Sequence, residues 1–242
     1  MREKGKPVPS KRGRSVRRQR AWQVDAAPVI AGWKRRLVLL AETPEYVFRD
    51  TPRHLIEQHY QRLTTFVGYS EPEVADAEAR LGVQFPAVFR EYLREMAKSP
   101  GELFRGSHVA TITEFEEFRA DALALLVETD PALSLPHKAV VFLSHQGYTF
   151  VYLLAVGGFD GPPMQWTETK REPQQVAATF ADMVDAELRL VESNNLAFRE
   201  QGGYYLTLHT EGGSSQSHPA LASGERPLDQ VPPGKPWWWF WQ

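Results

Sequence analysis

The pattern of the chain changes at Asp130–Pro131, and this change constrains the fold more strongly than any other feature of the sequence. Before it, apolar residues recur at the spacing of helices. After it, residues 139–143 and 148–154 form two runs rich in β-branched and aromatic side chains, and Gly147 lies in the short turn between them. Since strands joined by a short turn pair antiparallel, the sequence predicts a single α+β domain with helices packed on a mainly antiparallel sheet.

Four helices are expected before residue 130, and the second has the clearest boundaries. Its Ser70 and Glu73 fit a capping box, and Gly82 suits a left-handed C-terminal cap. Pro86 then opens the third helix, so these two helices meet at a tight corner. The expected helices begin with the caps or first-turn residues Thr51, Ser70, Pro86 and Thr113 and end near Gly68, Gly82, Ser99 and Asp130. Residues 37–40 fit a short strand or an extended arm and are left unassigned.

The remainder of the chain predicts a third strand at 164–167, a last helix starting at Pro173 and a closing strand at 203–208. The buried stripe expected on this helix is Val176, Phe180, Met183, Val184, Leu188 and Val191. The expected organisation is a basic disordered head at 1–21, one domain at 22–209 and a Gly/Ser/Pro-rich tail at 210–242.

Charge is divided unevenly along the chain. Residues 1–20 hold nine Lys or Arg and one Glu, so the rest carries 19 basic and 29 acidic residues, a net charge of −10. The absence of cysteine excludes disulfides, thiolate metal sites and a thiol nucleophile. The apolar runs are far shorter than the roughly 18 residues of a membrane-spanning helix, and no continuous apolar segment follows the basic start. A cytoplasmic protein without membrane contact is therefore expected.

Residues 71–96 resemble the segment that opens domains of the SUKH superfamily, a group that includes fungal cell-wall regulators and many bacterial immunity proteins. The segment consists of a helix with a glutamate, a Leu-Gly pair and a Pro-initiated aromatic helix. The residues in these positions are Glu78, Leu81, Gly82, Pro86, Phe89, Tyr92 and Leu93. Downstream, Gly147 in the hairpin and Phe180 at the head of the last helix are similar to further family positions, so that the resemblance covers residues 50–200.

The resemblance implies a non-enzymatic α+β protein without a cofactor. Bacterial relatives commonly bind and neutralise a cognate toxin delivered by a neighbouring cell, which makes a basic protein toxin the first expected partner. Many such toxins are nucleases, which must be basic to hold phosphate, so an acidic antidote suits them. The resemblance leaves open an intracellular regulatory or scaffold role, as in the fungal relatives.

An acidic stripe supplies the candidate contact residues. Glu114, Glu117, Asp121 and Glu128 recur at spacings of three, four and seven, so they line one helix face, and Arg119 is the only Lys or Arg of that segment. Like charges four residues apart destabilise a helix by about 0.2–0.5 kcal/mol per pair. Two interpretations remain open: a solvated face whose charges are answered by basic residues elsewhere in the fold, or a contact surface for a basic partner.

No pattern predicts catalysis or metal binding. Glu78 lies near an apolar stripe, so we expect its carboxylate to accept hydrogen bonds from the backbone or an arginine rather than to act as an acid. Ser144 and His145, with Asp160, contain the residue types of a hydrolytic triad, but adjacent residues on a strand point to opposite faces. The histidines lack the spacing of the zinc-binding helix motif. We therefore expect no catalytic residue, metal or cofactor.

The two ends of the chain carry the remaining unusual features. The basic head at 1–20 is expected to be a solvated tail, with non-specific nucleic-acid association through it as the alternative. Near the other end, Trp237, Trp238, Trp239 and Trp241 would expose a large apolar patch if left uncovered. We expect this cluster either to fold back on the protein's own surface or to insert into a partner or a second copy. The oligomeric state is left open.

Overall fold

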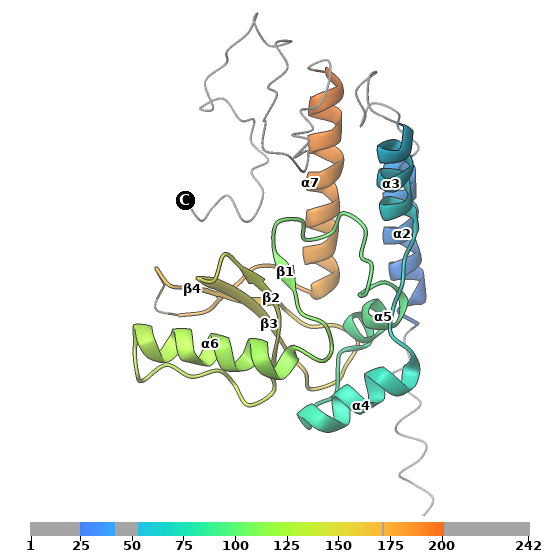
Figure 1. Ribbon diagram of the computed structural model, residues 1–242. Coiled ribbons are helices and arrows are strands. Elements are labelled where there is room, and N and C mark those ends of the chain that lie inside the picture. Colours follow the sequence, from blue (N-terminus) through green and yellow to red (C-terminus); the bar gives the residue numbers. More distant parts are fainter. Residues whose placement is uncertain (1–24, 42–52, 171, 201–242) are drawn as a thin grey trace, which may run out of the picture.

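The computed structural model describes residues 25–41, 53–170 and 172–200, and Figure 1 shows their arrangement. The helices are α2 (Ala27–Ala41), α3 (Arg53–Thr64), α4 (Glu71–Leu81), α5 (Ala87–Glu95), α6 (Phe115–Thr129) and α7 (Phe180–Glu200). The strands are β1 (His108–Val109), β2 (Ala139–His145), β3 (Thr149–Leu154), β4 (Met164–Thr167) and β5 (Gln174–Gln175). Helices combined with one antiparallel sheet confirm the predicted α+β class.

The sheet is a meander in the order β1-β2-β3-β4-β5, in which every neighbouring pair is antiparallel. The predicted hairpin is β2–β3, and its turn places both Gln146 (φ 51°) and Gly147 (φ 78°) in the left-handed region. Two consecutive left-handed residues match the twist of the flanking strands, which is why this turn needs a glycine. The predicted third strand is β4, whereas the two-residue strands β1 and β5 were not expected.

The core forms where α5 and α7 meet the sheet and α2 packs on these two helices, while α6 packs against β2 at another side (Figure 1). Phe89, Phe142 and Phe180, from α5, β2 and α7, have ring centroids 5.2–5.6 Å apart. Tyr92 and Trp33 extend this cluster through their contacts with Phe180. Because these rings come from four elements, the cluster fixes the helices against the sheet.

The corner between α4 and α5 has the predicted boundaries. Ser70 caps α4 and exchanges hydrogen bonds with Glu73, which completes the capping box. Gly82 ends the helix in the left-handed conformation, with φ of 64°. Pro86 immediately precedes the first residue of α5. Local sequence signals are therefore sufficient to specify this corner.

Helix α2 includes the segment that the sequence left unassigned. Ile30, Trp33, Leu37 and Leu40 are buried at spacings of three, four and three, as in a helix with one apolar face. Arg36 of the same helix forms ion pairs with Asp185 (2.8 Å) and Glu192 (2.7 Å) of α7. The helix is thus held to α7 by both apolar and charged contacts.

Three expected helix boundaries were wrong. The first of the four expected helices corresponds to α3, which ends at Thr64 and not near Gly68, because Val67 already pairs with Ser99. Helix α5 ends at Glu95 and not near Ser99, which pairs with Val67. The last helix starts at Phe180 and not at Pro173, since β5 pairs with β4 just after that proline. Val176 consequently lies outside the helix and is exposed. The closing strand expected at 203–208 falls outside the described residues.

The cap expected at Thr113 was also wrong, because Thr111 forms the hydrogen bonds at the start of α6. The Glu114 carboxylate accepts from the Thr111 backbone N–H at 2.7 Å and from its hydroxyl at 2.8 Å. The helix itself begins at Phe115, and Glu114 occupies the cap position without a side-chain capping bond of its own. Thr111 and Glu114 therefore form the hydrogen-bonded pair that was expected between Thr113 and Glu116, and Glu116 pairs with Arg80 instead.

Candidate functional site

The four acidic residues selected from the sequence all lie on or next to α6, but only three of them are exposed. Glu114 is half-buried and is held by Thr111, whose backbone hydrogen bond is the largest cause of the lowered pKa of Glu114. Nε2 of His108 on β1 lies 3.9 Å from the same carboxylate. Glu114 therefore belongs to the structure around the start of α6 and is less available to a partner than predicted.

A further acid of α6, Glu116, is neutralised from α4 by an ion pair with Arg80. The guanidinium of Arg80 also donates to the Ile112 carbonyl at 2.6 Å. Arg119, the single cation of α6, donates to two backbone carbonyls at 2.9 and 3.0 Å and leaves the stripe uncompensated. Arg80 and Arg119 are thus already engaged within the fold.

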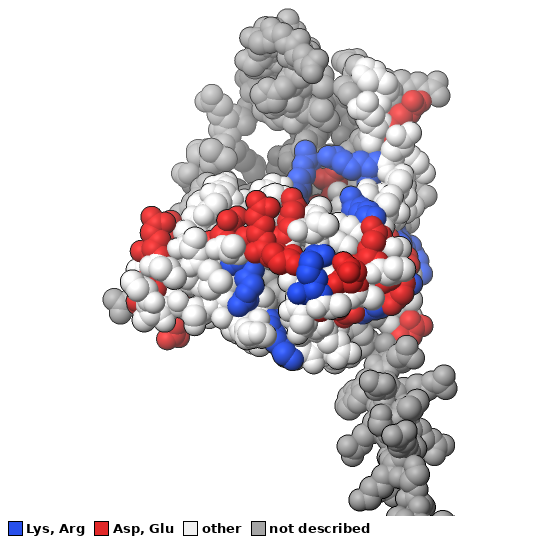
Figure 2. Space-filling model, turned by 60° about the horizontal axis from the view of Figure 1, so that its bottom comes forward, with Lys and Arg blue, Asp and Glu red and all other residues white. Residues whose placement is uncertain are grey.

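Glu117, Asp121 and Glu128 are the exposed members of the acidic stripe. Within residues 25–41, 53–170 and 172–200, the carboxylates of these three residues take part in neither a hydrogen bond nor an ion pair. Figure 2 shows the face that α4 and α6 form: acidic side chains spread over it, and basic side chains lie among them. The surface is therefore of mixed charge, with uncompensated negative charge on α6.

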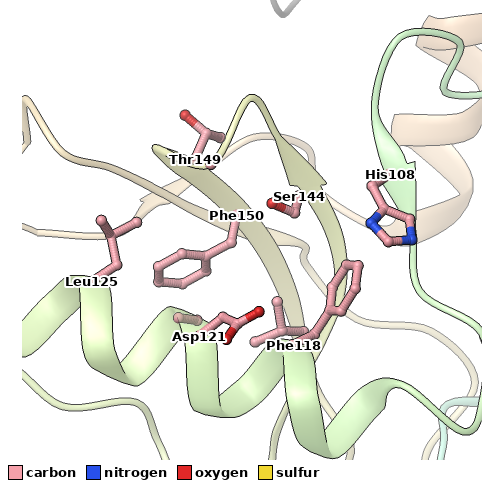
Figure 3. Close-up of a pocket in the computed structure, with 10 residues that line it drawn as sticks. His108, Phe118, Asp121, Leu125, Ser144, Thr149 and Phe150 are labelled. Atoms are coloured by element: carbon pink, nitrogen blue, oxygen red, sulfur yellow. The ribbon is translucent and has the colours of Figure 1, made fainter.

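A pocket of about 240 Å³ opens between α6 and the strands β1–β3. Asp121 lines it from α6, together with the apolar side chains of Phe118 and Leu125. Ser144 and Phe150 line it from the hairpin, where they are directly paired across β2 and β3. Figure 3 shows the Asp121 carboxylate extending from α6 toward the space between the Phe150 and Phe118 rings. The pocket thus combines aromatic walls with one carboxylate.

Sequence reasoning found Asp121 but missed the rest of this pocket. Phe118 lies three residues before Asp121 on α6, a spacing that places both side chains on neighbouring parts of one helix face. His108, whose ring stands edge-on to Phe118 with centroids 4.8 Å apart, comes from β1, which the sequence did not indicate. Ser144 was considered only as a nucleophile. Helical spacing was the one available signal, and it marked Phe118 as a core residue.

The structure does not assemble a hydrolytic triad. The side chain of His145 is buried and its Nδ1 lies 3.1 Å from the Ser107 hydroxyl, while the adjacent Ser144 lines the pocket. Asp160 accepts hydrogen bonds from the backbone N–H groups of Phe180 (3.1 Å) and Ala181 (3.0 Å). Asp160 therefore caps α7. Among the described residues, no group of three or more His, Asp or Glu side chains is arranged to hold a metal ion.

Glu78 joins the two helices of the corner. Its carboxylate accepts a hydrogen bond from the Phe85 N–H at 2.8 Å and another from Nε of Arg90 at 3.2 Å. Arg90 also pairs with Glu71 at the start of α4. Both kinds of donor expected for Glu78, backbone and arginine, are present, and they give this residue a structural position.

The other signature residues occupy positions in the core or at turns. Tyr92 and Phe180 are buried in the aromatic cluster, and Gly147 takes the left-handed position of the hairpin turn. Leu81 is partly buried against the core beside the left-handed Gly82. These positions explain why the signature is made of residues that fold the domain.

Residues 68–186, which extend from the chain before α4 into α7, match the SMI1/KNR4 family (SUKH-1). The chain belongs to the SUKH superfamily. The SUKH family includes immunity proteins and regulators, is associated with protein–protein interaction, and has generally non-catalytic members. No curated protein matches the chain.

Some of the expectations for this SUKH protein lie outside the described residues. They include the basic head, the tail and the cluster of Trp237, Trp238 and Trp239. Within the described parts, none of the helices combines the length and apolar character needed to cross a bilayer. The candidate site is therefore built from α6, β1 and the hairpin β2–β3.

Proposed function

We propose that this SUKH protein is an immunity protein that binds a cognate, basic protein toxin and neutralises it by occlusion. The observation that carries this proposal is the set of three exposed carboxylates on α6, Glu117, Asp121 and Glu128, which have no hydrogen-bond or ion-pair partner in the described part of the chain. Family membership supplies the class of function, and the uncompensated charge supports a basic partner.

The energetics of α6 support the same proposal. Glu117 and Asp121 are four residues apart, where like charges cost about 0.2–0.5 kcal/mol in an isolated helix. Arg80 and Arg119 do not offset this cost, since Arg80 is bound to Glu116 and Arg119 to backbone carbonyls. A basic partner would relieve the repulsion on binding and would be steered to this surface by opposite charge.

The genes that flank the gene for this protein are first searched for one that encodes a basic toxin, and the experiment is co-expression with the toxin found there. Cells that make the toxin should grow when the wild-type protein is present. The double charge reversal Glu117→Lys and Asp121→Lys should weaken binding of the purified toxin at least tenfold and remove protection. Glu172→Lys is the matched control: Glu172 is exposed, lies in the segment between β4 and β5 and belongs neither to α6 nor to the acidic stripe, so the affinity of this variant should stay within twofold of wild type.

The dependence of affinity on salt shows whether electrostatic attraction contributes to toxin binding. Affinity of the wild-type protein should fall as ionic strength rises, and the double reversal should have the flatter dependence. Failure of the wild-type protein to protect cells from that toxin would contradict the immunity role. Capture of several unrelated partners, all indifferent to the charge reversals, would favour the scaffold role instead.

A further inference from the structure

The pocket beside Asp121 has two polar groups that the fold leaves unused. Neither the Asp121 carboxylate nor the Ser144 hydroxyl has a hydrogen-bond or ion-pair partner among the described residues. Asp121 comes from α6 and Ser144 from β2, so the two acceptors approach the pocket from different elements (Figure 3). Together they offer hydrogen-bond acceptors to a donor that enters from outside.

Apolar side chains form part of the pocket wall, among them the aromatic rings of Phe118 and Phe150. Phe118 and Phe150 are buried, with 7% and 3% of their surface exposed, so their rings are held in place by the core. Phe150 is further fixed by stacking on Trp166, with centroids 5.4 Å apart. Leu125 closes the pocket along α6. A ligand here would therefore meet preformed ring surfaces as well as a negative charge.

The size of the pocket indicates what kind of group it holds. Its volume of about 240 Å³ lies below the roughly 300–1,000 Å³ of typical small-molecule sites. A single long side chain suits such a space better than a metabolite does. Since hot spots of protein interfaces are anchor side chains in small pockets, the pocket has the dimensions of an anchor site.

We propose that this pocket receives one arginine side chain from the bound protein; the source of that arginine rests on the proposed function, whereas the binding chemistry does not. The planar guanidinium stacks on aromatic rings and donates along its edges, so it matches ring walls beside a carboxylate and a hydroxyl. A lysine ammonium is a compact, strongly hydrated charge that cannot use the ring faces in this way.

The charges around the pocket favour a cation. None of the pocket's lining residues is a lysine or an arginine. Arg119 of α6 is committed to backbone carbonyls at 2.9 and 3.0 Å and does not compete for Asp121. Glu117 adds a second exposed carboxylate one helical turn before Asp121. The pocket is therefore complementary to an arginine in charge as well as in shape.

The test uses the N-acetylated amide of arginine as the probe and the full-length protein labelled with ¹⁵N. Titration should shift the backbone amide resonances of Asp121, Ser144 and Gly147. The matched neutral probe is the N-acetylated amide of citrulline, which has nearly the same shape without the charge and should leave these resonances unchanged. The N-acetylated amide of lysine should bind at least fivefold more weakly than the arginine probe.

Three variants test whether the arginine probe binds at the pocket. Asp121→Asn keeps the size of an exposed side chain and removes its charge, so the protein should fold normally and lose at least tenfold in affinity for the arginine probe. Glu128→Gln removes one charge of the same stripe outside the pocket lining and should change this affinity less than twofold. Ser144→Leu, which fills the pocket from β2, should abolish the shifts.

The outcomes distinguish this proposal from the immunity role. Absence of shifts with the arginine probe, equal shifts with citrulline or lysine, or unchanged binding to Asp121→Asn would overturn the arginine pocket even if cells remain protected from the toxin. Conversely, arginine-specific shifts lost in Asp121→Asn would establish the pocket even if no protection is observed, and the immunity role alone would then be wrong.

Discussion

At the scale of single residues, the clearest assignment is Glu78. Its carboxylate extends from α4 and accepts hydrogen bonds from the Phe85 N–H and from Arg90 of α5. This one side chain therefore connects α4 both to the loop before α5 and to α5 itself. The side chain is only 17% exposed. A carboxylate in such a place stabilises the fold through the hydrogen bonds that it satisfies, because leaving the Phe85 N–H without an acceptor is costly.

We predict that Glu78→Ala lowers the free energy of unfolding by about 1–3 kcal/mol, since it removes the acceptor of a partly buried backbone N–H and of Arg90. Glu78→Gln retains a carbonyl oxygen and should lose less. Urea denaturation followed by circular dichroism measures both. The control is Glu117→Ala, an exposed site that should stay within about 0.5 kcal/mol of wild type. Equal stability of Glu78→Ala and wild type would show that Glu78 does not stabilise the corner of α4 and α5.

At the scale of elements, two glycines illustrate opposite constraints. Gly32 lies inside α2, and a Cβ added there would meet no heavy atom within 4 Å. Gly68 precedes α4, and a Cβ there would lie 1.9 Å from the backbone oxygen of Arg94 in α5. The first glycine only loosens its helix, whereas the second allows two backbone segments to approach each other.

We predict that the two alanine substitutions change stability in opposite directions. Gly32→Ala should raise the free energy of unfolding by about 0.5–1 kcal/mol, because alanine is the better helix former. Gly68→Ala should lower it by about 3 kcal/mol, at the upper end of overpacking costs, because backbone atoms must move. Thermal melting of the two variants beside wild type measures this difference. A destabilised Gly32→Ala or a neutral Gly68→Ala would show that the packing around that glycine is described wrongly.

The elements also show which parts of the fold could be predicted from the sequence. The corner of α4 and α5 and the hairpin β2–β3 were predicted because Ser70, Gly82, Pro86 and Gly147 act locally. Strands β1 and β5 were missed because two residues carry no periodicity and their pairing depends on distant partners. The start of α7 was missed although a local signal was present: the Thr179 hydroxyl, next to Phe180, accepts a hydrogen bond from the Asp182 N–H at 3.0 Å. The further acceptor at this helix start, Asp160, lies 20 residues away from Phe180 and could not be found from local sequence.

The candidate site divides in the same way. The spacing of Glu117, Asp121 and Glu128 along one helix was sufficient to predict the stripe. The engagement of Glu114 and the pocket beside Asp121 depend on β1 and on the hairpin, which sequence periodicity does not place in space. The spacing of charges therefore predicted the acidic face of α6, whereas only the tertiary structure shows which of its residues are exposed and which line the pocket.

At the scale of the whole molecule, several acidic groups respond to pH in the same sense. The pKa values of Glu71, Glu73, Glu114 and Glu116 are all lowered by hydrogen bonds that exist only in the fold. Hydrogen bonds to Ser70 lower the pKa of Glu73 to about 2. The stability that such groups contribute is fully present above the pKa of the unfolded chain and is lost as pH falls through the folded pKa.

We therefore predict that the urea concentration at the midpoint of unfolding decreases as the pH is lowered from 5 to 2.5. Asp160 acts in the opposite sense, because burial raises its pKa and so disfavours its ionised form in the fold. The four glutamates with lowered pKa values outnumber this single aspartate, so their effect should dominate. Glu73→Gln preserves a capping side chain and removes one titrating group, so its midpoint should depend less on pH. Measurements in matched ionic strength decide this, and a flat wild-type profile would refute it.

The sheet as a whole is bounded by very short strands. In the described part of the chain, β1 and β5 form its two edges and contain two residues each. Edges of this length expose too few backbone donors and acceptors for another extended segment to align along them. A strand added along β1 or β5 would therefore form few backbone hydrogen bonds, so a molecule recognised at either of these two strands would be held mainly by side chains.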